Sequence, residues 1–184
     1  MDWQDTKWKI TKEVFPSEII SIIGDIFAGI ILTILIVPFE SFLILIILVP
    51  AMLSMRGNIS GPFIARTSRD IIIGEFNKKS FFENVLATYA LSIFVAFLIG
   101  LFGILLNYFF VRLFIVANGV LILIPIFSIL LTLSISIPFS TTLNILVFKR
   151  GLDPNNVVNP IMTAVDDFFT VLCFYLTIIM LGVP

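Results

Sequence analysis

Long stretches without a charged residue constrain this chain of 184 residues more than any other feature. The two longest cover residues 84–111 and 113–148, and shorter ones cover 26–39, 41–55 and 168–184. A helix needs about 20 mainly apolar residues to cross the hydrocarbon core of a bilayer, which is about 30 Å thick. Most of the chain therefore belongs in a membrane.

We predict an all-α integral membrane protein with five transmembrane helices, at about residues 18–37, 40–58, 82–110, 115–147 and 158–182. Hydrophobic residues make up 59% of the chain and charged residues 12%, against about 45–50% and about 25% in soluble domains. One membrane domain over residues 17–184 follows a short segment, residues 1–16. In that segment Trp3 and Trp8 stand among lysines, which suits either a cytoplasmic segment at the headgroup level or a frayed tail.

The distribution of positive charge predicts the orientation, because cytoplasmic segments retain Lys and Arg. Of the 11 basic residues, only Arg112 falls on the far side of the expected spans. The others precede the first span, lie around the connection between the second and third, or follow the fourth. We therefore expect a cytoplasmic N-terminus, an outside C-terminus, and a multi-pass protein of the cell membrane whose partners include membrane lipid.

Charge and composition also exclude several functions. The net charge is -1, so no basic excess is available for a nucleic-acid partner. The chain has no histidine and a single cysteine, Cys173, which excludes the thiolate and imidazole sites that bind zinc, copper or iron. Any metal ion would meet oxygen ligands. No motif for covalent catalysis or nucleotide binding occurs, so we do not expect an enzyme.

Two adjacent carboxylates stand out in the fifth span. With Asn159 as N-cap and Pro160 at the first helical position, Asp166 and Asp167 would lie about two turns inside, at a depth of roughly 10 Å. A charged side chain at the centre of a bilayer costs about 2.5–3.5 kcal/mol on insertion scales. Each carboxylate therefore needs a partner or a water-filled cavity.

Helical spacing groups the polar side chains of this span. Residues four apart lie on the same face, which links Asn159 with Thr163 and Thr163 with Asp167. The same spacing links Asp166 with Thr170, and Thr177 follows seven residues later. We expect one polar stripe that lines a cation pathway, with Asp167 as its main acid. Asp166 could equally pair with Arg56 or cap a neighbouring helix.

The first span carries a third acid among small residues. Asp25 shares a face with Ser21, Ala28 and Gly29, and small residues let another helix approach closely. We expect Asp25 to find a hydrogen-bond donor on that helix, although it is also a candidate for the pathway.

The second span contains two backbone signals. Pro50 removes a helical hydrogen bond, and the run from Met55 to Asn58 is expected to end the helix. Freed carbonyl oxygens and Asn58 could then contact a hydrated ion. A plain helix C-cap explains Gly57 and Asn58 equally well.

Two segments resemble the MgtE family of magnesium transporters: LVPAMLSMRGNISGPFIAR at 48–66 and DPNNVVNPIMTAVDD at 153–167. In that family and its eukaryotic solute-carrier relatives, a Pro-Ala stretch leads to Gly-Asn, and an Asp-Pro-x-Asn loop leads to Pro-x-x-Thr and an Asp. The corresponding positions are Pro50, Ala51, Gly57, Asn58, Asp153, Pro154, Asn156, Pro160, Thr163 and Asp167. The resemblance covers nearly the whole chain after about residue 17.

The resemblance implies five spans, with Asp167 as the pore carboxylate. The resemblance assigns no role to Asp166. Glu40 is similar to an acidic position of the solute-carrier relatives. Those relatives contain two copies of the membrane unit, which implies a homodimer here, or a heterodimer with a homologous half. Bacterial members usually carry cytosolic magnesium-sensing domains, which residues 1–16 are too short to hold.

The implied function is a transporter or channel for divalent cations, above all Mg²⁺. Mg²⁺ keeps several waters and is usually bound through one or two carboxylates, which two copies of Asp167 would supply. The alternatives are an exchanger coupled to Na⁺ or H⁺, and a non-transporting membrane subunit of a larger complex. The candidate metal ligands are Asp167, Asp166, Asn58 and Thr163, and the candidates for lining or gating the pore are Pro50, Gly57, Asn159, Pro160, Thr170, Asp25 and Glu40.

Overall fold

Five long helices make up nearly all of the computed structural model, which describes residues 6–184 without the side chain of Phe42. They are α1 (Lys7–Ile36), α2 (Phe42–Ile72), α3 (Lys78–Leu106), α4 (Asn118–Lys149) and α5 (Pro154–Met180), with a π-helical turn, η1 (Asn107–Val111), after α3. Each of the five is long and apolar enough to cross a membrane, and residues 6–184 contain no strand. The predicted all-α fold with five spans is confirmed.

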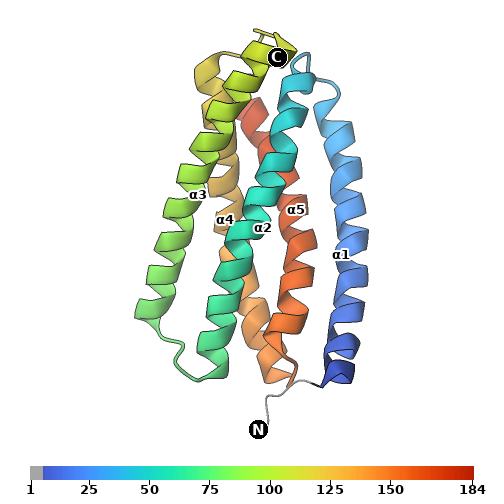
Figure 1. The fold of residues 1–184 in the computed structure, drawn as a ribbon, viewed down its shortest axis with the longest axis vertical. Coiled ribbons are helices and arrows are strands. Elements are labelled where there is room, and N and C mark those ends of the chain that lie inside the picture. Colours follow the sequence, from blue (N-terminus) through green and yellow to red (C-terminus); the bar gives the residue numbers. More distant parts are fainter. Residues whose placement is uncertain (1–5) are drawn as a thin grey trace.

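Successive helices run in opposite directions, and the start of α1 and the C-terminus lie at opposite ends of the bundle (Figure 1). Helix α5 is central, because it packs against α1, α4 and α2. Helix α3 packs on α4 and α2, whereas α1 contacts almost only α5. One side of α5 therefore lies between α1 and α2, which barely touch each other.

The close packing of α1 on α5 depends on small residues. A Cβ atom added at Gly24 would overlap with the side chain of Ala164, so the two helices approach closely at this point. Ser21 and Ala28 are buried on the same side of α1, as the sequence predicted. Gly29, which was expected to share that face, is instead exposed, with open space around it.

The N-terminus of α5 differs from the prediction. Asp153, not Asn159, is the N-cap: its side chain accepts a hydrogen bond from the Asn155 backbone N–H at 2.8 Å, and Pro154 occupies the first turn. Pro160 lies inside the helix. Asp166 is 12 residues from the helix start, a depth of about 18 Å rather than 10 Å.

Helix α2 also differs, because it continues through Gly57 and Asn58 to Ile72. The expected helix end, with its freed carbonyl groups, is wrong. Residues that end helices in water are tolerated within spans, since the hydrocarbon core offers the backbone no other hydrogen-bond partner. Arg56 consequently lies inside the bundle and not near a loop.

Residues 7–16 form the first turns of α1, which runs without a break through Pro16. Glu13 ties this stretch to the start of α5, since it accepts a hydrogen bond from the Asn156 side-chain amide at 2.9 Å. The ammonium group of Lys12 lies 5.0 Å from the centre of the Trp8 ring. Trp3 falls outside the described residues, and a position at the membrane surface remains a prediction.

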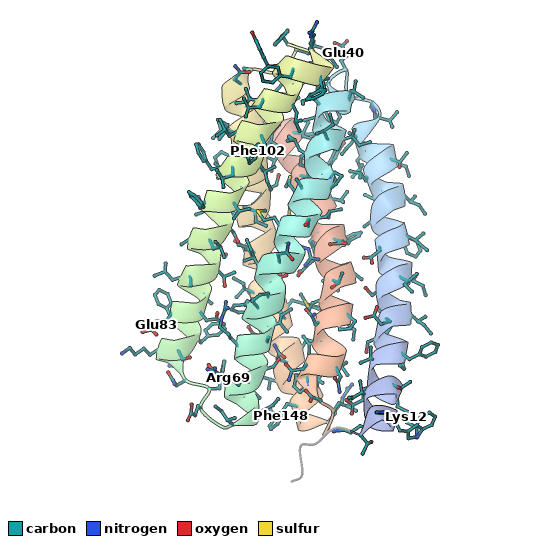
Figure 2. All side chains as sticks on the ribbon, viewed as in Figure 1. Lys12, Glu40, Arg69, Glu83, Phe102 and Phe148 are labelled. Carbon is teal, nitrogen blue, oxygen red and sulfur yellow. The ribbon has the colours of Figure 1, made fainter. Side chains whose placement is uncertain are left out.

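Two apolar clusters fill the bundle, one above the other along its axis. One contains Leu45, Leu48, Leu121 and Phe174, and the other contains Phe63, Leu133 and Met162. On α5, the residues between these clusters include the buried polar side chains of Asp166 and Thr170, whereas on α2 Arg56 and Ser60 are buried among residues of the second cluster. Figure 2 shows Lys12 and Arg69 towards one end of the bundle and Glu40 at the other. Large apolar side chains such as Phe27 and Phe102 are exposed, as expected for contact with lipid.

Candidate functional site

A buried guanidinium joins α2 to the two aspartates of α5. Arg56, whose side chain is 3% exposed, donates from Nη1 to Oδ2 of Asp166. It also donates to Oδ1 of Asp167, from Nε at 3.1 Å and from Nη2 at 2.7 Å. The five donors of the planar guanidinium let one side chain reach two adjacent carboxylates that diverge by about 100° around the helix. The sequence raised this pairing only as an alternative for one of the acids.

Neighbouring polar groups complete this cluster. Ser60, one turn after Arg56, accepts a hydrogen bond from Arg56 Nη1 at 3.1 Å, and its hydroxyl lies 3.3 Å from Asp166 Oδ2. The carbonyl oxygen of Thr163 accepts from Arg56 Nη2 at 3.3 Å. Sequence reasoning missed Ser60, although its spacing of four residues from a charged residue within a span was a usable signal.

Burial separates the two aspartates. The Asp166 side chain is fully buried, and within the described part of the chain its Oδ1 atom has no hydrogen-bond partner. The Asp167 side chain is 17% exposed. Asp166 therefore faces the interior of the bundle, while Asp167 lies at its edge.

The predicted single stripe on α5 is consequently two stripes. Thr170 and Thr177 are buried on the interior side with Asp166. Asn159 is exposed and Thr163 half-buried on the side of Asp167. The spacing-of-four rule was correct for each stripe, but adjacent residues differ by about 100°, too wide an angle for one stripe to contain both aspartates.

Helix α4 extends the interior polar region. Five buried polar residues recur at every fourth position of this helix: Ser128, Thr132, Ser136, Ser140 and Asn144. The Thr132 hydroxyl donates to the Ser128 carbonyl oxygen at 2.9 Å, and Ser68 of α2 donates to the Asn144 side-chain oxygen at 2.6 Å. These contacts give Thr132 and Asn144 structural roles within the helix bundle, while Ser136 lies near Asp166.

Asp25 lies on the exposed side of α1 and within interaction range of Asp167. Its other charged neighbours are Arg56 and Glu18. We expected a hydrogen-bond partner on the adjacent helix, and the group of α5 with which Asp25 interacts is the carboxyl group of Asp167. The closeness of α1 and α5 thus brings two acids together from two helices.

The other predicted residues divide into those near this edge and those far from it. Gly57 and Asn58 are exposed on α2, and the Asn159 side-chain oxygen lies 3.6 Å from where a Cβ at Gly61 would stand. Pro50 is exposed on α2, nearer its N-terminus. Glu40 is exposed in the turn between α1 and α2, at the end of the bundle (Figure 2), and is not part of the cluster.

A cation at the exposed edge of the bundle beside Asp167 would therefore meet only oxygen ligands among the described residues. Among residues 6–184, no three acidic or thiol side chains gather as a metal-binding group. Asp25 and Asp167 supply two neighbouring carboxylates, and the Thr163 hydroxyl, which donates to the Asn159 carbonyl oxygen at 3.0 Å, keeps its lone pairs available.

A sequence model of the MgtE family, described as a divalent cation transporter, matches residues 49–177. The chain belongs to the MgtE family. The match begins in α2 and ends in α5, so it contains Arg56, Asp166 and Asp167. The MgtE assignment makes the chain a multi-pass membrane protein of a transporter family, whose function is divalent cation transport. Helix α1, with Asp25, precedes the matched region. No curated protein and no solved structure matches the chain.

Removal of the Arg56 guanidinium should destabilise the bundle, because it leaves two carboxylates without a counter-charge. We expect Arg56→Leu to lower the free energy of unfolding by about 3–5 kcal/mol. Arg69→Leu is the matched control: that side chain is 69% exposed and contacts Asp70 at 3.1 Å, so its loss should cost about 1 kcal/mol or less. Thermal unfolding of both variants in detergent tests this, and equal losses would contradict the counter-ion role.

Proposed function

We propose that the transported ion is hydrated Mg²⁺ and that it passes Asp167, at an interface between two membrane units. One observation carries the proposal: Asp167, the partly exposed member of the pair, lies beside Asp25 on the side of α5 between α1 and α2. A second acid beside Asp167 favours a doubly charged ion over a singly charged one.

The arrangement suits an ion that keeps its water. Mg²⁺ dehydrates reluctantly and is usually bound through one or two carboxylates with several waters retained. Asn58, Asn159 and Thr163 are exposed or half-buried polar residues of α2 and α5, and they would accept hydrogen bonds from those waters. Contact through water also explains why the site needs few direct ligands.

A second membrane unit is part of the proposal, because one chain leaves Asp167 and its neighbours at an open edge. The exposed side of α2 carries small or polar residues at Ser54, Gly57 and Asn58, which would let an opposing helix approach closely. We propose a homodimer, in which two copies of Asp167 face one pathway. A heterodimer with a homologous half is the alternative.

Native mass spectrometry of a transport-active sample checks the assembly. We expect a mass of two chains, since Asp167 is partly exposed at the edge of a single chain. A second polypeptide of similar size would indicate the heterodimer, and a population of monomers alone would contradict both arrangements.

We also propose that the N-terminus is cytoplasmic and that the protein lies in the cell membrane. Arg56 is inside the bundle. Of the other ten basic residues, nine lie towards the end of the bundle where α1 begins, and Arg112 lies at the opposite end. Lys78 and Lys79 begin α3 and Lys149 ends α4, so these charges gather at one end.

Cysteine labelling in intact cells tests the orientation. The native Cys173 is buried, so an impermeant thiol reagent should report mainly on introduced sites. We expect Lys149→Cys to be protected and Pro184→Cys to be labelled, because these positions lie at opposite ends of the bundle. The reverse pattern would invert the proposed topology.

An exchanger coupled to Na⁺ or H⁺ is the second candidate. It is favoured by a pair of adjacent carboxylates, of which Asp166 is fully buried and Asp167 more exposed. Chains of acidic groups within membranes often carry protons. Mg²⁺ transport that continues without a Na⁺ or H⁺ gradient would exclude this candidate.

Asp167→Asn should remove most Mg²⁺ flux while the protein remains folded, because the ion loses one negative charge per chain. Asp166→Asn should retain flux at saturating Mg²⁺ but lower the free energy of unfolding by a few kcal/mol at most. Flux into liposomes and thermal stability, measured at equal amounts of reconstituted protein, separate the two effects. Full flux through Asp167→Asn together with lost flux in Asp166→Asn would show that the other carboxylate meets the ion.

A further inference from the structure

The Arg56 guanidinium occupies the same carboxylate that the transported ion is proposed to meet. We propose that Arg56 is a tethered cation that competes with the ion for Asp167, and that Asp166 holds the guanidinium when the ion binds. Arg56 thereby makes the site favour divalent over monovalent cations. This inference rests on the proposed function, in which Asp167 is the ion-binding acid.

The contacts of Arg56 show a cation shared between two acids. Two of its nitrogens, Nε and Nη2, donate to one oxygen of Asp167, while Nη1 donates to one oxygen of Asp166. The guanidinium is rigid and planar, so these donors move together. A shift that releases Asp167 therefore carries the whole group towards the interior of the bundle.

The interior offers an acceptor to the displaced guanidinium, in a region where the Ser136 hydroxyl of α4 also lies near Asp166. The second oxygen of Asp166, Oδ1, is buried and has no hydrogen-bond partner among the residues that the structure describes. A buried acceptor without a donor is costly, so a donor that moves towards it is favoured. Ser60 already contacts both Arg56 and Asp166 and would hold the pair together.

The charges explain why a divalent ion displaces Arg56 and a monovalent ion does not. Arg56, Asp166 and Asp167 together carry a charge of -1, and Asp25 is a further carboxyl group beside Asp167. A monovalent ion brings no more charge than the guanidinium, which is already tethered beside Asp167 at high effective concentration. A divalent ion doubles the Coulomb attraction to the same carboxylates.

Asp166 therefore acts on ion binding without touching the ion. Its charge attracts Arg56 away from Asp167, so its loss should leave the guanidinium wholly on Asp167. Removal of Arg56 and the Asp166 charge together should free Asp167, while the local charge of the three positions stays at -1. A purely structural role would not shift the ion affinity of these two variants in opposite directions.

The test is the Mg²⁺ concentration that gives half-maximal flux into liposomes, with Na⁺ and K⁺ as competitors. We expect Asp166→Asn to raise this concentration by about tenfold, within the range of roughly 5- to 150-fold that is typical of coupled sites. The double variant Arg56→Gln with Asp166→Asn should lower it below the wild-type value and make flux sensitive to Na⁺ and K⁺. Arg56→Lys, which keeps the tethered charge, should retain the discrimination against Na⁺ and K⁺.

Asp70→Asn is the matched control. Asp70 also contacts an arginine on α2, Arg69, but it lies 14 residues after Arg56 on that helix and therefore away from the Arg56 cluster. Its half-maximal concentration should equal that of the wild type. An unchanged half-maximal Mg²⁺ concentration in Asp166→Asn would overturn the proposed competition between Arg56 and the ion, whether or not the double variant folds. Full flux through Asp167→Asn would instead overturn the proposed function itself, so the two failures are distinguishable.

Discussion

The ion pairs of Arg56 with Asp166 and Asp167 are the interaction on which the arrangement of this bundle depends. A charged group within the membrane is costly unless it is paired, and here one cation serves two acids from a neighbouring helix. The cluster fixes α2 against α5 in register and in rotation, because a turn of either helix would leave a buried charge unpaired. Loss of one partner is more costly than the net stabilisation that the pairs provide.

The rest of the fold positions this cluster at the edge of the chain. Apolar clusters lie on both sides of Asp166 along α5 and exclude water from its carboxylate. The close contact of Gly24 with Ala164 brings α1 against α5, and with it Asp25 near Asp167. One side of the cluster is thus dry and the other partly exposed, and this difference gives two adjacent aspartates different roles.

Much of this could be predicted from the sequence, because uncharged runs and membrane thickness determine the spans. The MgtE resemblance, carried by segments around Gly57–Asn58 and Pro160–Asp167, agrees with the family match. Gly57 did not mark a helix end, since α2 continues through it, and the proline start signal of α5 belonged to Pro154 and not to Pro160. Spacing shows that Asp166 and Asp167 point in different directions, but it does not show which of them is buried, because that depends on how α5 packs against α1, α2 and α4.

The central claim is that this chain, without another protein, moves divalent cations past Asp167. Mg²⁺ flux into liposomes that contain only the purified chain, with no Na⁺ or H⁺ gradient, tests it most directly. The account predicts uptake that follows the Mg²⁺ gradient and exceeds the leak of protein-free liposomes. Uptake no greater than that leak, from folded and correctly assembled protein, would contradict it and favour either a coupled exchanger or a non-transporting membrane subunit.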